Sequence, residues 1–211
     1  MIQQGKFITV EGIEGVGKST NLRYIQNFLT EKGIDLVATR EPGGTPVAEA
    51  VRELLLDVRH TDMVSDTELL LMFAARAQHI QELIKPALAQ GQWVVSDRFT
   101  DATYAYQGGG RGVSIERISE LEQWVQGDLR PDMTLILDAD PKIGLARVAS
   151  RGEDTDRFEQ EKVDFFHKVR SVYLRQAGLA PERYAIIDAS QSLAAVQAQL
   201  SDTLQVFLSR K

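Results

Sequence analysis

The stretch Gly12-Ile-Glu-Gly-Val-Gly-Lys-Ser19 decides the fold of this chain, because it matches the pattern G-x-x-x-x-G-K-[ST] at every fixed position. An apolar run over residues 7–10 precedes it, and a helical pattern over residues 19–31 follows it. A strand, a glycine-rich turn and a helix in this order are the context in which the motif forms a phosphate-binding loop. The sequence therefore predicts a nucleotide-binding fold that begins with this loop.

Each part of the loop contributes to holding phosphate groups. Glycines let successive backbone N–H groups point into one concavity, and the start of the helix adds unpaired N–H donors and a positive dipole end. Lys18 supplies a mobile charge for the β- and γ-phosphates of ATP, and the Ser19 hydroxyl is the expected Mg²⁺ ligand. The predicted ATP- and phosphate-binding residues are Gly12, Ile13, Glu14, Gly15, Val16, Gly17, Lys18, Ser19 and Thr20.

Outward from the loop, short apolar runs alternate with longer helical patterns. Strands are expected over residues 7–10, 36–39, 93–96, 134–137 and 184–187, and helices over residues 19–31, 45–56, 67–89, 114–126, 141–149, 160–177 and 193–208. This alternation is typical of a parallel sheet covered on both faces. We predict a single α/β domain over residues 1–211: a five-stranded parallel sheet flanked by helices in the three-layer P-loop NTPase fold, with a short lid at residues 151–157.

Composition excludes several classes of function. The 211 residues include 24 Lys and Arg against 30 Asp and Glu, and this net charge of −6 argues against a duplex-DNA-binding protein. The chain has no cysteine, so disulfides, thiolate metal sites and a cysteine nucleophile are excluded. No apolar run approaches the roughly 20 residues of a membrane-spanning helix, and no signal-peptide pattern is present. We expect a cytoplasmic protein with neither nucleic acid nor membrane as a partner.

Among P-loop proteins, a small-molecule kinase fits this chain best. A GTP-dependent switch needs an Asn-Lys-x-Asp motif, and the only asparagines are Asn21 and Asn27, both on the first predicted helix. A motor or helicase would need a longer chain. Small kinases hold two sets of phosphates with arginines and close a lid to exclude water from the transferred group.

The expected parts of such a kinase are present. Asp97 and Arg98 end a buried strand, where Asp97 can order Mg²⁺ or its waters and Arg98 can bridge phosphates, although a plain ion pair at the strand end is the alternative. Arg147, Arg151 and Arg157 bracket a polar, glycine-containing stretch that reads as a lid, with arginines able to neutralise transition-state charge. An ordinary solvated basic helix end is the alternative for each of these three.

The motifs together resemble the bacterial thymidylate kinase family of P-loop nucleoside monophosphate kinases, over nearly the whole chain. In combination they are highly specific, although the Pro-Gly-Gly segment alone is also a common turn. The matching segments are Gly12–Ser19, Thr39–Thr45, Phe73–Arg76, Asp97–Phe99, Tyr104–Gly112, Arg130–Asp132 and Asp156–Glu161. The resemblance implies transfer of the γ-phosphoryl group of ATP, with Mg²⁺, to dTMP for dTTP synthesis.

The resemblance also implies which residues bind the acceptor nucleotide. Glu14 is expected near the sugar 3′-hydroxyl, Arg52 and Arg98 on the acceptor phosphate, and Glu41-Pro42 as a cis peptide at this site. The implied dTMP-binding residues are Glu14, Pro42, Arg52, Phe73, Arg76, Arg98, Thr103, Tyr106 and Gln107.

Among these residues, Arg76 is expected to donate to O4 of thymine, and Phe73 to stack on the ring from the same helical face. Many relatives place the aromatic residue four positions before the arginine, where this chain has Met72, so which side chain stacks stays open. Thr103 and Gln107 resemble the pair at the far edge of the base. Tyr106 resembles the residue that packs on the sugar and crowds a 2′-hydroxyl.

Further implications of the resemblance are a lid that supplies a catalytic arginine and assembly as a homodimer. The variable loop positions 13–16 hold no arginine, so Arg151 and Arg157 are the candidates, and the sequence does not rank them. With Lys18 and Arg98 they form the predicted catalytic set. Trp124 fits either the core or a dimer contact.

Two other functions stay open at this stage. A kinase for another nucleoside monophosphate or for a deoxynucleoside would use the same loop, and Glu14 could serve as the general base that a hydroxyl acceptor requires. A non-catalytic ATP-binding regulatory module is the alternative from another class. The predicted pair of acceptor arginines, Arg76 and Arg98, argues against the module.

Overall fold

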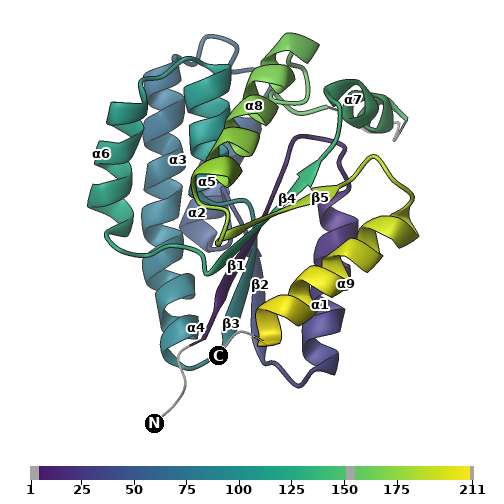
Figure 1. Ribbon diagram of the computed structural model, residues 1–211. Coiled ribbons are helices and arrows are strands. Elements are labelled where there is room, and N and C mark those ends of the chain that lie inside the picture. Colours follow the sequence, from purple (N-terminus) through teal and green to yellow (C-terminus); the bar gives the residue numbers. More distant parts are fainter. Residues whose placement is uncertain (1–4, 151–154, 210–211) are drawn as a thin grey trace.

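Five parallel strands form one sheet in the order β2-β3-β1-β4-β5 in the computed structural model, which describes residues 5–150 and 155–209 (Figure 1). Every residue of β1 is buried, as expected for a central strand covered on both faces. The five strands predicted from the apolar runs are confirmed, each to within one residue at either end. They are β1 (Phe7–Glu11), β2 (Leu36–Arg40), β3 (Trp93–Asp97), β4 (Met133–Asp138) and β5 (Tyr184–Asp188).

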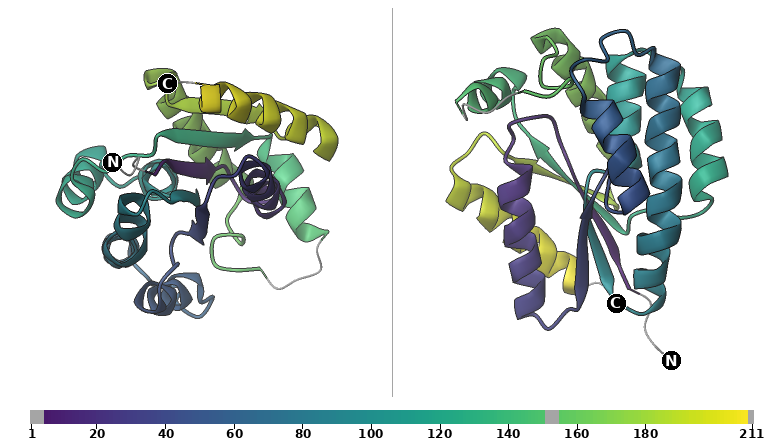
Figure 2. Two further views of the ribbon diagram at one scale, coloured as in Figure 1. Left: turned by 90° about the horizontal axis from the view of Figure 1, so that it is seen from below. Right: turned by 180° about the vertical axis from the view of Figure 1, so that it is seen from behind.

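Helices cover the two faces of the sheet. On one face, α1 (Lys18–Glu31) and α9 (Leu193–Ser209) lie together, and on the other α2 (Pro46–Leu56), α3 (Ser65–His79), α6 (Ile115–Gln126) and α8 (Val163–Leu179) gather (Figures 1 and 2). The main core cluster joins Ile25 of α1 and Leu200 of α9 to Leu135 of β4 and Phe166 of α8. The predicted three-layer P-loop fold is confirmed.

Local capping explains where several helices begin. Thr45 precedes α2 and its hydroxyl accepts a hydrogen bond from Ala48 N, while Pro46 occupies the first helical position, where no N–H is required. Asp140 caps α7 (Pro141–Ala149) in the same way, through Lys142 N. These short polar residues before an apolar pattern are the signals that locate the helix starts in the sequence.

One expectation about the helices needs correction. The single helix expected over residues 67–89 begins at Ser65 and contains a π-helical turn, η1 (Ile80–Ile84), before α4 (Lys85–Ala89). The glycine-rich segment after Gln107 is part of a second π-helix, η2 (Tyr104–Gly110), which follows the short α5 (Thr100–Thr103). A Cβ on Gly109 would lie 2.6 Å from Val172 of α8, so glycine there serves close helix packing rather than mobility.

Parallel strands bring their carboxyl ends to one edge of the sheet. Val10 of β1 pairs with Asp97 of β3 and with Leu135 of β4, and Arg40 of β2 also pairs with Asp97. The loops that leave these strands therefore meet above the centre of the sheet, the usual place for a ligand in this class of fold. In residues 5–150 and 155–209, no helix has the length and apolar character needed to cross a membrane.

Candidate functional site

A cavity of about 490 Å³ opens at this edge of the sheet. It unites the phosphate-binding loop with side chains from β3, α2, α3, α5 and η2, segments that are far apart in the sequence. The predicted site residues that line it are Glu14, Gly15, Gly17, Lys18, Ser19, Thr20, Pro42, Arg52, Arg76, Asp97, Arg98, Thr103, Tyr106 and Gln107.

The loop between β1 and α1 has the geometry that its glycines predict. Gly12, Gly15 and Gly17 have φ angles of 133°, 72° and 88°, which side-chain-bearing residues rarely adopt. A Cβ on Gly15 would lie 2.0 Å from the carbonyl oxygen of Gly144, so the loop packs backbone against backbone on α7. The side chains of Ile13 and Val16 are buried in the core, which leaves only their backbone groups to face a phosphate.

Lys18 folds back over this loop. Its Nζ donates to the carbonyl oxygens of Gly12 at 3.1 Å and Ile13 at 2.8 Å. Burial, together with the nearby charge of Arg98, lowers the pKa of Lys18 to about 8. The ammonium is therefore held at the loop before a nucleotide arrives, but its positive charge is poorly compensated there.

Arg98, directly after β3, lines the cavity and bonds several of its other residues. Its Nη1 donates to Gly12 O at 2.9 Å, and its Nη2 donates to Glu14 Oε1 at 2.8 Å and to the Tyr106 hydroxyl at 2.9 Å. Burial alone would lower the pKa of Arg98, but Tyr106, Tyr173, Glu14 and Asp97 outweigh it and raise that pKa further. Arg98 thus forms its ion pair with Glu14 of the loop. The alternative considered from the sequence, an ion pair with Asp97 at the strand end, is not what the structure shows.

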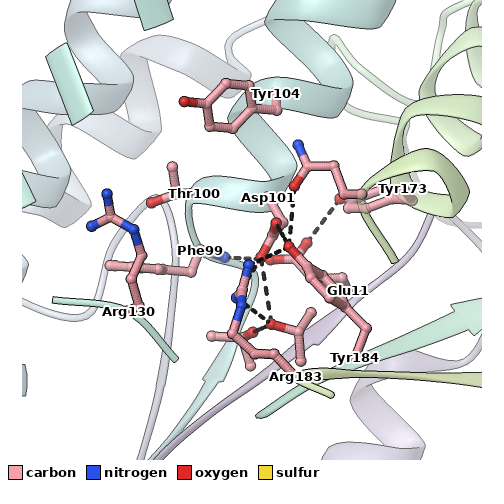
Figure 3. A network of polar contacts seen from close by, with 12 residues as sticks. Glu11, Phe99, Thr100, Asp101, Tyr104, Arg130, Tyr173, Arg183 and Tyr184 are labelled. Carbon is pink, nitrogen blue, oxygen red and sulfur yellow. Dashed lines mark hydrogen bonds and ion pairs between the residues drawn. The ribbon is translucent and has the colours of Figure 1, made fainter. Parts of the chain in front are cut away.

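A buried carboxylate, Glu11, holds the backbone beneath Arg98. Arg98 has a φ of 69°, the one positive φ among the non-glycine residues that the structure describes. Glu11 Oε1 accepts from Phe99 N at 2.7 Å and Oε2 accepts from the Tyr173 hydroxyl at 2.8 Å, as Figure 3 shows. Burial, with the adjacent charge of Asp101, raises the pKa of Glu11 to about 8.

Sequence reasoning missed both Glu11 and Tyr173. An ionisable residue that ends an otherwise apolar strand was a usable signal for Glu11. Tyr173 offered none, because an aromatic residue on an amphipathic helix is usually part of the core. The Tyr173 hydroxyl also accepts from Arg98 Nη1 at 3.0 Å, so α8 contributes directly to the site.

Arg76 on α3 also lines the cavity and is almost fully buried. Its Nε donates to Glu41 Oε2 at 2.7 Å, and its Nη2 donates to Phe99 O at 3.2 Å and to Thr103 Oγ1 at 2.9 Å. Its Nη1 is buried with no hydrogen-bond partner among the described residues. A buried donor without an acceptor costs about 1–3 kcal/mol, so this atom is suited to an acceptor atom of a bound ligand.

Comparison with known proteins agrees with this arrangement. Residues 10–200 match the family model described as thymidylate kinase. The chain belongs to the thymidylate kinase family. It is 61% identical over 204 residues to a thymidylate kinase of Ectopseudomonas mendocina, covering 97% of each chain. It is 57% identical over 204 residues to that of Teredinibacter turnerae, covering 97% of this chain and 99% of the relative.

A solved structure supports the same assignment. The crystal structure of thymidylate kinase from Ehrlichia chaffeensis matches with a TM-score of 0.78 and 34% identity, over 96% of this chain and 99% of that one. Members of the thymidylate kinase family are phosphotransferases, and the prediction of a nucleoside monophosphate kinase is confirmed. The alternative of a non-catalytic ATP-binding module is set aside.

The structure resolves how α3 of this thymidylate kinase family member faces the cavity. Met72 lines the cavity, whereas Phe73 does not. The Phe73 side chain packs with Leu69 and Ile118 in a separate core cluster, an arrangement that favours Met72 of the two candidates for the base contact. Met72 and Arg76 are four positions apart and share one helical face. Phe73 is one position after Met72, so its side chain points about 100° away around the helix axis.

The turn after β2 has the expected backbone form. The Glu41-Pro42 peptide is cis, as the resemblance implied. Arg52 Nη1 donates to Pro42 O at 2.8 Å, which places its guanidinium at the rim of the cavity. Burial and the neighbouring charge of Arg40 lower the pKa of Arg52, so this cation gains from an anionic ligand.

The two lid candidates differ in what the structure describes. Arg151 lies outside the described residues, as do positions 152–154 of the expected lid. Arg157 donates through Nε to Leu55 O at 2.9 Å and through Nη2 to Glu68 Oε2 at 2.5 Å. Arg157 does not line the cavity, so the structure does not bring its guanidinium to the phosphate-binding loop.

The residues predicted for Mg²⁺ suit a cation that is shared with phosphate groups. Asp97 Oδ1 is buried without a hydrogen-bond partner among the described residues, and Ser19 lines the same cavity. Within residues 5–150 and 155–209, no cluster of three or more His, Cys, Asp and Glu side chains could hold a metal alone. Phosphate oxygens and water would therefore complete the coordination, as Mg²⁺ prefers at phosphate sites.

Proposed function

We propose that this chain transfers the γ-phosphoryl group of ATP-Mg²⁺ to dTMP and forms dTDP and ADP, as a step toward dTTP. One observation carries the proposal: the cavity that contains the phosphate-binding loop also contains Arg76, whose buried Nη1 has no partner among the described residues. One end of the cavity suits phosphates and the other suits a base with a carbonyl acceptor. Arg98 lies between the two ends.

Donor binding uses the loop and Lys18. The backbone N–H groups of the loop and the start of α1 face the β- and γ-phosphates. Lys18 Nζ, now on the Gly12 and Ile13 carbonyls, exchanges these neutral acceptors for charged phosphate oxygens. Mg²⁺, when bound, neutralises charge on the β- and γ-phosphates, and Ser19 and Asp97 would hold it there.

Acceptor binding uses the arginines. Arg98 exchanges Glu14 for the acceptor phosphate, and Arg52 approaches the same phosphate from the rim of the cavity. An anionic phosphate oxygen attacks the γ-phosphorus while the bond to the β–γ bridging oxygen breaks, so no general base is needed. Catalysis then rests on positioning and charge neutralisation.

Arg151 and Arg157 remain the proposed sources of a lid cation, and Arg157 would first have to leave Glu68.

Base recognition uses Arg76 and its neighbours. We assign Arg76 Nη1 to O4 of thymine, Met72 to the ring face, and Thr103 and Gln107 to the base edge beyond O4, where N3–H lies. The Tyr106 hydroxyl donates to Glu14 Oε2 at 2.6 Å. This bond fixes the Tyr106 ring, which we propose crowds the 2′-hydroxyl of a ribonucleotide acceptor.

We further propose that the chain works as a cytoplasmic homodimer. Trp124 of α6 is 82% exposed, and Leu70 of the neighbouring α3 and Val64 just before it are also exposed, an arrangement that suits a partner surface. Leu121, in contrast, packs into the core beneath α6.

Release of ADP, measured by a coupled assay over a panel of acceptors, tests the proposed function. With ATP and Mg²⁺, dTMP should give the highest kcat/KM, above dUMP, dCMP, UMP and thymidine. Thymidine should fail, because it lacks the phosphate that Arg52 and Arg98 are proposed to hold. Equal or better turnover with UMP or thymidine would assign the chain another acceptor.

Proton uptake on ATP binding should report the protonation of the Lys18 side chain. Phosphate anions favour the charged ammonium, so binding raises the pKa of Lys18 from its value of about 8 in the free protein. ATP affinity should therefore fall as pH rises above 8, and binding at pH 8 should take up about half a proton at this position. Calorimetry in buffers of different ionisation enthalpy measures the uptake. Lys18→Arg should lose it, because a guanidinium stays protonated, and equal uptake in both proteins would refute the assignment.

A further inference from the structure

One buried carboxylate, that of Glu68 on α3, bonds three side chains from two other segments next to the cavity. Glu68 is 1% exposed. Its Oε1 accepts from Gln107 Nε2 at 2.8 Å and from Arg111 Nε at 3.3 Å, and its Oε2 accepts from Arg157 Nη2 at 2.5 Å. The residue does not line the cavity, but Gln107 does. Glu68 therefore stands directly behind a side chain that we assign to the base.

The charges around Glu68 determine which way the Gln107 amide faces. Glu68 already accepts hydrogen bonds from two guanidinium groups, those of Arg111 and Arg157, so both of its oxygens act as acceptors here. The group that Gln107 turns toward Glu68 must therefore be its NH₂ group. The carbonyl Oε1 of Gln107 is then the acceptor that remains for a ligand in the cavity.

We propose that Glu68 is a positioning residue that determines base specificity, because it holds Gln107 with an acceptor toward the base. The inference rests on the proposed function. Thymine presents a carbonyl oxygen at position 4 and an N–H at position 3, which match Arg76 Nη1 as donor and Gln107 Oε1 as acceptor. Cytosine presents an amino group and an unprotonated nitrogen there, so both contacts would be mismatched.

The substitution Glu68→Gln tests this proposal, since a glutamine can accept or donate and no longer dictates the orientation of Gln107. The ratio of kcat/KM for dTMP over dCMP should fall about 10-fold or more, the effect of one mispaired buried hydrogen bond. The KM for dTMP should rise more than kcat falls, because the loss lies in base binding. An unchanged ratio in a cooperatively folded Glu68→Gln protein would overturn the proposal.

Glu161→Gln is the matched control. Glu161 pairs with Arg111, the same guanidinium that contacts Glu68, but has no contact with Gln107 among the described residues. The control removes an equivalent charge from the same cluster, and its dTMP to dCMP ratio should stay within about twofold of wild type. A fall in this control equal to that in Glu68→Gln would assign the effect to the charge cluster and overturn the specific role of Glu68.

A measurement on the unchanged protein covers the case in which Glu68→Gln does not fold. The side-chain NH₂ resonances of Gln107, assigned by their absence in Gln107→Glu, should shift little when dTMP is added, because Nε2 stays on Glu68. A large shift, as expected if Nε2 donates to the base instead, would overturn the proposal. Wild-type turnover of dTMP is measured first, so a failure of the proposed function is recognised separately.

Discussion

Replacing Arg98 with alanine should lower kcat for dTMP phosphorylation by about 10³-fold, at the upper end of the range for the loss of one preorganised donor to a developing charge. Arg98 is the cation that we propose to lie between the two phosphate subsites, and its two terminal nitrogens bond Gly12 O, Glu14, Tyr106 and Tyr173. Its removal also leaves the Glu14 carboxylate uncompensated beside the phosphates. The KM for dTMP should rise more than the KM for ATP, because the acceptor phosphate loses its main cation.

Two further arginine substitutions serve as comparisons for this result. Arg98→Lys keeps the charge but loses the planar pair of donors, so its kcat should lie between those of wild type and Arg98→Ala. Arg40→Ala removes a guanidinium from the end of the adjacent strand, where it pairs with Glu49 outside the cavity, and should change kcat little. Thermal melting checks that each variant folds. A cooperatively folded Arg98→Ala protein with nearly normal kcat would exclude Arg98 from the transfer step.

Replacing Lys18 with alanine should have an effect of similar size, about 10²- to 10³-fold on kcat. The ammonium is the mobile cation of the loop, and its present partners are two neutral carbonyl oxygens that bind it less strongly than phosphate oxygens would. Single-turnover measurements at saturating ATP separate the transfer step from ATP binding, and both should be impaired.

The matched control for Lys18 lies at the other end of the same helix. Lys32 caps the C-terminus of α1, and its ammonium lies 5.8 Å from the centre of the Phe28 ring, away from the cavity. Lys32→Ala should keep kcat within about twofold of wild type, as expected for a surface substitution. Unimpaired single-turnover transfer by Lys18→Ala would contradict the role of the loop in catalysis.

Fold and phosphate site were predictable because their signals are local. A strand, a loop and a helix around Gly12–Ser19 depend on residue spacing and on the backbone freedom of glycine, both of which are visible in a short window. The same holds for the other four strands, whose apolar runs mark them directly. Of the proposed acceptor residues, Arg52 and Arg76 came from the family resemblance and Arg98 also from its place at a strand end, and all three line the cavity.

Tertiary packing decided which buried side chains bond to the residues that line the cavity. Which of Met72 and Phe73 lines the cavity depended on how α3 is rotated against α6, which no helical pattern specifies. Glu11 and Tyr173 meet across 162 positions of sequence, and Glu68 meets Arg157 across 89. Residue types and spacing thus determined the strands, the loop and the chemistry of the phosphate site. Partners of buried polar groups were decided only in the folded chain, because a buried charge takes whichever donors the packing of distant segments brings within reach.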